Sequence, residues 1–152
     1  MKFHPDGHLL AIGTAGGQVK IYEIKSGMQA ATFEIGAPVT QLQFSENGIW
    51  FATVVQDSPV VSIWDIRKSA TAVKELEIGG KVESISWDYT GQYIVAGGSQ
   101  GIVVEQYSKA AKEWTRQLRA AIPATVISWG KSAQAIVAVD ETGAVTTLGG
   151  QA

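Results

Sequence analysis

Two histidines, His4 and His8, have the spacing that comes closest to a metal site. An interval of four residues suits zinc when both side chains lie on one face of a helix. Pro5 and Gly7 stand in the same stretch, however, and both residue types are typical of a turn. The pattern therefore predicts a solvent-exposed turn and no metal site.

Residue types that serve as nucleophiles or hold phosphate likewise do not indicate a catalytic or phosphate-binding site. The sequence has no cysteine, which excludes disulfides, thiolate metal sites and cysteine nucleophiles. No serine stands in a G-x-S-x-G motif, and both histidines lie in one turn, so a Ser-His-Asp arrangement is not expected. The glycine-rich stretches 13–17 and 97–101 lead into predicted strands and lack the lysine of a phosphate-binding loop. We predict no catalytic site and no cofactor.

A local excess of positive charge surrounds Trp114. It is made by Lys109, Lys112, Arg116 and Arg119. One interpretation is a single-stranded RNA site, in which the aromatic ring would stack on a base. We favour a solvated outer strand and loop, because a single aromatic residue without a basic groove gives little support for RNA binding. The 12 Lys and Arg residues are spread along a chain of net charge −2, and we expect no direct nucleic-acid partner.

The strands and turns that make up the chain are easiest to recognise in residues 44–68. Asn47 and Gly48 separate two apolar runs, which strongly indicates a hairpin turn. The run that follows is rich in β-branched and aromatic residues, as in a strand buried on both faces. Pro59 has no amide hydrogen for a sheet, so it belongs in the turn before the next strand. Two hairpins in series predict a meander.

The same pattern occurs four times along the chain. Phe3, Phe44 and Trp87 each stand four residues before a turn glycine, and Trp129 takes the same place without the glycine. Successive aromatic residues are separated by 41, 43 and 42 positions. A period of ~40 to 45 residues is typical of a propeller blade with four strands. We predict four repeats, at residues 1–38, 39–81, 82–124 and 125–152.

Alternating hydrophobicity and turn residues predict the strands of each repeat. They are expected at 1–3, 8–14, 18–24 and 28–35; at 39–44, 49–55, 60–66 and 73–78; at 82–87, 92–97, 102–107 and 114–119; and at 125–129, 134–139 and 144–148. Only residues 108–121 conflict with this scheme, because alanine and long polar side chains favour a helix there. The place in the repeat requires an outer strand, so we predict a strand at 114–119, with a short helical turn at 109–113 as the alternative.

The repeats resemble those of the WD40 family, on the evidence of Trp64 and Asp65 and of the turn motifs FHPDG and FSENG. The resemblance implies an all-β fold: a partial WD40 β-propeller of about four blades of antiparallel sheet, not closed within the chain. The Gly-His pair that usually precedes each inner strand is absent. Asp57 and Asp140 stand near the place of the family's buried aspartate, and we expect the blades to depend mainly on apolar packing.

Within that family, the order of motifs is similar to the C-terminal propeller of spliceosomal U-box ubiquitin ligases. This resemblance implies a nuclear, non-catalytic scaffold whose partners are proteins, namely components of the spliceosomal nineteen complex and ubiquitination substrates, with no membrane contact. Ligase activity and tetramer formation would belong to a U-box and a coiled coil that this sequence lacks. We expect the chain to be the last half of such a propeller, with a truncated start and a natural end, and to self-associate through its exposed strand edges.

An alternative function follows from residues 64–67, Trp-Asp-Ile-Arg. This stretch is similar to the WDxR box by which some WD40 proteins dock on a cullin ubiquitin ligase as substrate receptors. Either function needs a surface for partners. In WD40 propellers partners most often contact the face built from the turns between second and third strands and the crossovers between blades. The residues at those places here are Gln56, Asp57, Lys81, Gln100 and Glu141.

Overall fold

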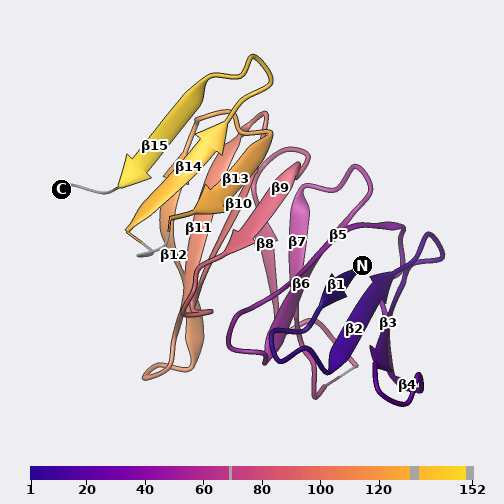
Figure 1. Cartoon of the computed structure of the whole chain (residues 1–152). Helices are drawn as coiled ribbons and strands as arrows, with labels where there is room; N and C mark the ends of the chain where they lie inside the picture. The colour runs from indigo at the N-terminus through magenta and orange to yellow at the C-terminus, as the bar shows by residue number, and fades with distance from the viewer. Residues whose placement is uncertain (69, 131–133, 150–152) are drawn as a thin grey trace. The chain divides into compact units, whose positions relative to one another are not determined.

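The computed structural model describes residues 1–68, 70–130 and 134–149, which form fifteen β-strands and no helix. They fold into two compact units, Met1–Leu76 and the part of the chain from Glu77 onward. Within the described residues every sheet is antiparallel and is built from strands that follow one another in sequence, as Figure 1 shows.

The first unit contains the first two sheets. The first sheet is formed by β1 (Lys2–Phe3), β2 (Leu9–Gly13), β3 (Gln18–Glu23) and β4 (Gln29–Glu34). The second sheet is formed by β5 (Val39–Phe44), β6 (Trp50–Val55), β7 (Val60–Asp65) and β8 (Lys74–Glu77), and β8 runs across the boundary between the units. Both sheets are meanders, because neighbouring strands in space are also neighbours in sequence.

The second unit contains the other two sheets. One is formed by β9 (Ser84–Trp87), β10 (Tyr93–Gly98), β11 (Gly101–Ser108) and β12 (Glu113–Ala120). The other has three described strands, β13 (Val126–Trp129), β14 (Ala135–Val139) and β15 (Val145–Gly149). The predicted fold class is therefore confirmed: the chain is all-β, with four antiparallel sheets, and no described sheet joins strands of the first and last repeats. The exact repeat boundaries remain a prediction.

The outer strand β12 forms where local propensity favoured a helix. Tyr107 pairs with Trp114 and Gln106 with Thr115 along the β11–β12 ladder, and the register shifts by one residue beside Glu105. Residues 109–112 form the connecting turn. Pairing with β11 satisfies the backbone groups of the segment, so tertiary context overrides its helix propensity.

Aromatic side chains dominate the core of the first unit. Phe33, from the first sheet, meets Phe51 and Trp64, from the second, with ring centroids 4.8 and 6.0 Å apart in edge-to-face geometry. Phe51 also stacks on Trp64 at 6.4 Å. One polar contact lies within this packing, because the Trp64 indole nitrogen donates to the hydroxyl of Thr53 at 3.0 Å and both residues are buried. The expected apolar packing is thus supplemented by a buried hydrogen bond.

The core of the second unit is mainly aliphatic. Val95, Ile102 and Val104 pack against Ile127 and Ile136 of the last sheet. A hydrogen bond also joins these two sheets: the Trp129 indole nitrogen donates to the backbone carbonyl of Ser86 at 3.1 Å. Each core thus joins two sheets that follow one another in sequence.

In the first three repeats, the residue after the repeat aromatic organises the turn that follows it. In the turns beginning at His4, Ser45 and Asp88, the carbonyl of that residue accepts a hydrogen bond from the glycine three positions later. Asp88 has an additional role: its buried carboxylate accepts bonds from the backbone amides of Thr90, Gln92 and Tyr93 and from the Thr90 hydroxyl. The turn geometry thus repeats although the residue that supports it differs.

Candidate partner-binding surface

In the first unit, the predicted contact residues Gln56 and Asp57 lie in the turn between β6 and β7, and both are exposed. Asp57 has a φ of 56°, which lies in the left-handed region that aspartate and asparagine enter more readily than most residues. The ends of two core strands hold this turn in place. It therefore presents polar side chains on a supported backbone.

In the second unit, Lys81, Gln100 and Glu141 lie in connections at one edge of its sheets, and all three are exposed. Glycine allows the connection that holds Lys81 to approach both the end of β10 and the Gln100 side chain closely. A β-carbon at Gly98 would lie 2.0 Å from the Lys81 carbonyl oxygen, and one at Gly80 would lie 2.2 Å from Cγ of Gln100. The structure thus places Lys81 and Gln100 close to one sheet end. Whether a partner contacts these residues remains a prediction.

An acidic pocket of about 260 Å³ opens at this edge. It is lined by Glu83, Ser99, Pro123, Ala124, Thr125, Asp140, Glu141 and Thr142. Three of these residues carry carboxylates and none is Lys or Arg, so the pocket suits a positively charged or hydrogen-bond-donating group. Among the residues proposed from the sequence as partner contacts, only Glu141 lines it. Asp140 was noted in the sequence only as standing near the place of the family's buried aspartate. The remaining lining residues had no sequence signal, because the pocket is formed by four connections far apart in the chain.

Asp140 holds the turn that forms one wall of this pocket. Its Oδ1 accepts hydrogen bonds from the backbone amides of Thr142 and Ala144, at 2.8 and 3.0 Å, and from the Thr142 hydroxyl at 2.6 Å. These bonds favour the ionised form, and the Thr142 hydroxyl is the main cause of the lowered pKa of Asp140. The carboxylate is therefore charged throughout the physiological pH range.

The stretch that suggested a cullin-docking box forms a local ion pair. Asp65 is buried, and the Arg67 guanidinium donates to its two carboxylate oxygens at 2.9 and 2.6 Å. The backbone amide of Arg67 donates to the same carboxylate. The pair thus stabilises the turn after β7, which is a structural role for the motif. A docking role for it remains a prediction.

This ion pair predicts a pH-dependent contribution to stability. The side-chain bond from Arg67 is the largest cause of the lowered pKa of Asp65, which lies below the ordinary value of 3.8. A carboxylate with a lowered folded-state pKa stabilises the fold above its unfolded pKa, and this stabilisation is lost as pH falls through the folded pKa. We expect Arg67→Gln to lower the urea midpoint at pH 7, and the difference from the original protein to shrink below about pH 4. A difference that stayed constant down to pH 2 would contradict this assignment.

Two residues of the basic segment, Trp114 and Arg116, have partners within the protein. The Trp114 ring packs against Trp87 and Tyr107, with centroids 6.0 and 5.4 Å apart, so it has aromatic partners within the protein. Arg116 forms an ion pair with the buried Glu105 at 3.2 Å. These contacts agree with the interpretation of this segment as a structural outer strand.

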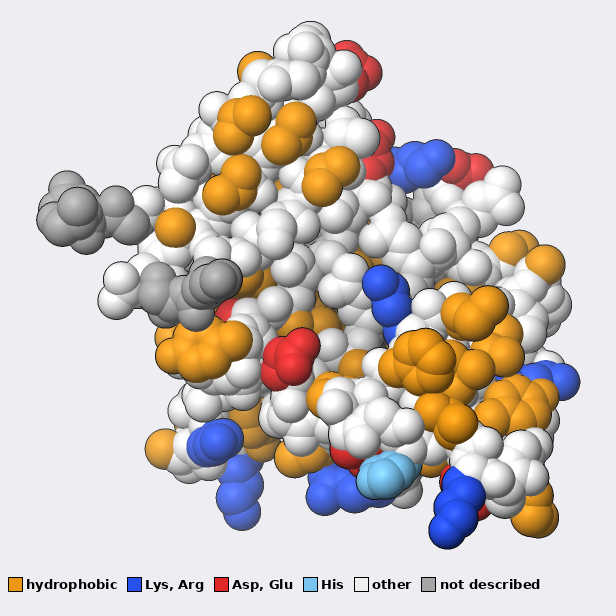
Figure 2. Space-filling view, in the orientation of Figure 1, with side chains coloured by type: hydrophobic (Ala, Val, Ile, Leu, Met, Phe, Trp, Pro, Cys, Tyr) orange, Lys and Arg blue, Asp and Glu red, His pale blue; other side chains and the backbone are white. Residues whose placement is uncertain are grey.

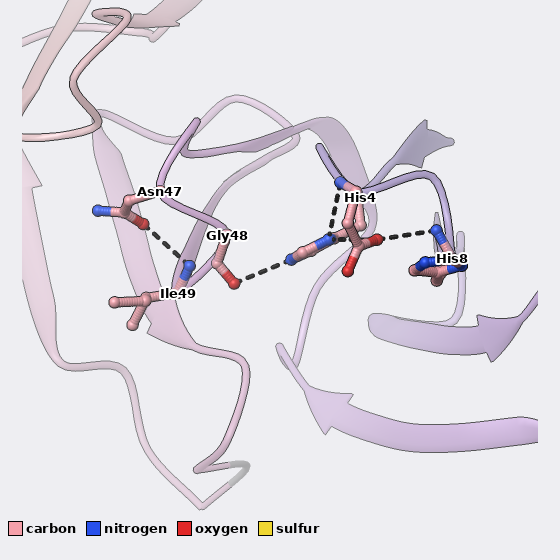
Figure 3. A network of polar contacts seen from close by, with 6 residues as sticks. His4, His8, Asn47, Gly48 and Ile49 are labelled. Carbon is pink, nitrogen blue, oxygen red and sulfur yellow. Dashed lines mark hydrogen bonds and ion pairs between the residues drawn. The ribbon is translucent and has the colours of Figure 1, made fainter.

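Both histidines contact Asp6, His4 through its ring and His8 through its backbone amide (Figure 3). The His4 ring contacts Asp6 Oδ1 through Nδ1 at 2.8 Å and the Gly48 carbonyl through Nε2 at 2.9 Å, whereas the backbone amide of His8 donates to Asp6. Within residues 1–68, 70–130 and 134–149, no group of three or more His, Cys, Asp and Glu side chains is arranged to hold a metal ion. Nor do these residues contain a helix that could span a membrane.

One face of the last sheet is apolar and exposed. Val126, Val137 and Val145 are 56, 37 and 65% exposed. Figure 2 shows the corresponding group of hydrophobic side chains over the region of β14 and β15. Their β-branched side chains alternate with the residues that β13 and β14 bury in the core.

Comparison with known proteins supports this description at the level of sequence and fold. The family described as the anaphase-promoting complex subunit 4 WD40 domain matches residues 1–47. Two solved structures are similar over almost the whole chain at 17% identity. One belongs to the crystal structure of the mitotic checkpoint complex, with a TM-score of 0.76 over 97% of this chain and 49% of that one. The other is the Cps50 (Swd1) beta-propeller domain of Myceliophteria thermophila, with a TM-score of 0.77 over 99% of this chain and 52% of that one.

Curated relatives have higher identity. Pre-mRNA-processing factor 19 of Schizosaccharomyces pombe is 36% identical over 112 residues, covering 73% of this chain and 23% of the relative. The same factor of Oryza sativa is 37% identical over 116 residues, covering 74% of this chain and 21% of the relative. Pre-mRNA-processing factor 19 homolog 2 of Arabidopsis thaliana is 34% identical over 138 residues, covering 87% of this chain and 25% of the relative. The chain therefore spans about a quarter of the length of these relatives.

Proposed function

Because the chain belongs to the WD40-repeat family and is homologous to part of pre-mRNA-processing factor 19, we propose that it is a protein-interaction module of a splicing factor. Its role is to recruit protein partners in the nucleus, including components of the spliceosomal nineteen complex. Any ubiquitin-ligase activity belongs to other parts of a full-length protein, and this chain contributes the recruitment of substrates. The identity to three relatives that are pre-mRNA-processing factors carries this proposal.

The arrangement of exposed side chains supports a role in recognition. Its exposed polar residues stand on turns at the ends of core strands, where the scaffold supports their backbone. The acidic pocket beside Glu141 adds a concave, charged feature to the same edge of the second unit. A concave feature among exposed turns is a typical docking place for the side chain of a partner.

The predicted contact surface can be tested by changing its charges together. We expect the combination Asp57→Asn, Lys81→Glu and Glu141→Lys to reduce the amount of spliceosomal protein captured from nuclear extract by about tenfold, because charge complementarity selects partners. Asparagine is chosen at position 57 because it also tolerates a left-handed backbone. Quantitative mass spectrometry of the captured proteins measures the effect.

A matched control makes the same three kinds of charge change at turns that lie at the other ends of the strands from the predicted contact residues. Glu46, Lys109 and Glu113 are exposed and lie in or beside the turns between β5 and β6 and between β11 and β12. The combination Glu46→Gln, Lys109→Glu and Glu113→Lys is expected to leave capture unchanged. Equal capture by both combinations, with unaltered circular dichroism, would argue against this surface. No spliceosomal protein captured by the original chain would argue against the function itself.

A further inference from the structure

A second pocket of the second unit contains one cation in largely apolar surroundings. Its volume is about 380 Å³, which lies in the lower part of the ~300–1,000 Å³ range of ligand sites. It is lined by Ile78, Gln100, Gly101, Ile102, Arg119, Ala120 and Ala121. Of these residues, only Gln100 was singled out in the sequence as a partner contact.

The backbone beside the pocket accepts one hydrogen bond from the Arg119 guanidinium. Its Nη2 donates to the Ile78 carbonyl at 3.4 Å, and it lies over Gly79, where a β-carbon would be only 2.8 Å away. Gly79 also has a φ of 88°, so both its conformation and the space above it favour glycine. The crossover before β9 is therefore shaped to let the arginine side chain lie against it.

Most of the hydrogen-bonding capacity of Arg119 is unused within the described residues. A guanidinium has five N–H donors, and the bond to Ile78 is the one hydrogen bond that Arg119 donates within the described residues. No described carboxylate lies within ion-pair distance of it, in contrast to Arg116, which is paired with Glu105. The pocket thus combines a cation and the Gln100 amide with an apolar lining, in which Ala120 and Ala121 are accessible and Ile78 and Ile102 are buried.

The ligand chemistry follows from this combination. A guanidinium binds a carboxylate through two parallel hydrogen bonds, and such pairs are among the strongest in proteins. A nucleic acid would require several phosphate contacts, yet Lys109 and Lys112 lie near the other end of β12, about 20–25 Å along the strand from Arg119. The aromatic ring of the segment, Trp114, packs against Trp87 and Tyr107. One cation beside apolar walls fits one acidic side chain.

We propose that this pocket receives an Asp or Glu side chain from an extended segment of a partner protein. The carboxylate binds Arg119, and an apolar neighbour in the segment contacts the accessible part of the lining at Ala120 and Ala121. The inference rests on the proposed function, to which it adds the chemistry of the partner. It also gives Gln100 a role, as a hydrogen-bonding group at the mouth of the pocket.

Peptide titration followed by NMR tests this proposal on the 152-residue chain. The probe is the capped peptide Leu-Glu-Leu-Ala, and its control is Leu-Gln-Leu-Ala. We expect the glutamate peptide to shift the amide signals of Gln100, Gly101 and Ala120 and to bind about tenfold more tightly than the glutamine peptide. The variant Arg119→Gln should remove this preference, whereas Lys109→Gln, at the other end of the outer strand, should leave it unchanged.

Three results would overturn the proposal: no saturable binding of the glutamate peptide, equal binding of both peptides, or an unchanged preference in Arg119→Gln. Binding of oligouridine that depends on Arg119, without binding of the acidic peptide, would instead assign the pocket to RNA. Capture of spliceosomal proteins from nuclear extract is measured on the same variants. Capture retained by a chain that shows no acidic-peptide binding would leave the proposed function in place and overturn only the pocket assignment.

Discussion

Replacing Phe51 with alanine is expected to lower the free energy of unfolding by about 3–5 kcal/mol, the largest effect of any single core substitution that we predict. Phe51 is fully buried in β6 and contacts the rings of Phe33, Phe44 and Trp64 at centroid distances of 4.8, 5.9 and 6.4 Å. Alanine would remove the ring that joins the two sheets of the first unit. The cavity left behind adds to the lost transfer free energy because neighbouring rings relax only in part.

Urea denaturation followed by tryptophan fluorescence measures the loss, with Phe3→Ala as the control. Phe3 belongs to β1 and is 65% exposed, so its removal should change the free energy of unfolding by about 0.5 kcal/mol or less. If Phe51→Ala does not fold, Phe51→Leu gives a smaller cavity and a measurable intermediate effect. A loss below about 1 kcal/mol for Phe51→Ala would show that this ring is not central to the core.

The sequence predicted the strands well because their signals are local. Alternation of apolar residues and the turn glycines set strand limits such as 39–44 for β5, which the structure reproduces as Val39–Phe44. The outer strand β12 was predictable only from its place in the repeat, since its alanine and long polar residues favour a helix. The repeat period therefore supplied information that no single segment contained.

The pockets could not be predicted, because they depend on contacts between distant parts of the chain. The acidic pocket joins Glu83 to Asp140 and Glu141, from separate connections. The placement of Arg119 depends on its approach to the backbone of Ile78 and Gly79, 40 positions earlier or more. A sequence reveals that such residues are polar or small, but tertiary packing decides which of them meet.

The burial of the turn residue Asp88 is a third feature that could not be predicted from the sequence. In the sequence it is one residue of the repeated aromatic-turn motif, in the place that His4 and Ser45 occupy in other repeats. Its burial became evident only with the structure, which leaves the side chain with no exposure to solvent. An unremarkable turn residue is thus a buried acceptor for several backbone amides.

We therefore expect Asp88→Ala to lower the free energy of unfolding by about 3 kcal/mol or more, because several hydrogen-bond donors would lose their acceptor at once. The carboxylate accepts bonds from the backbone amides of Thr90, Gln92 and Tyr93 at 3.0, 2.9 and 2.8 Å. Asp88→Asn should be intermediate, because an amide keeps one acceptor oxygen and replaces the other with a donor. The measurement is urea denaturation, combined with hydrogen exchange of the Gln92 and Tyr93 amides.

Asp140→Ala is the matched control for this prediction. Asp140 also accepts two backbone amides and a threonine hydroxyl in a turn of the same unit, but water can reach that turn. Solvent can replace the lost acceptor there, whereas the amides bonded to Asp88 are left without one. Asp88→Ala should therefore destabilise the protein clearly more than Asp140→Ala and should speed exchange at Gln92 and Tyr93. Equal losses for the two variants would mean that burial of the Asp88 carboxylate adds nothing to the stability of the second unit.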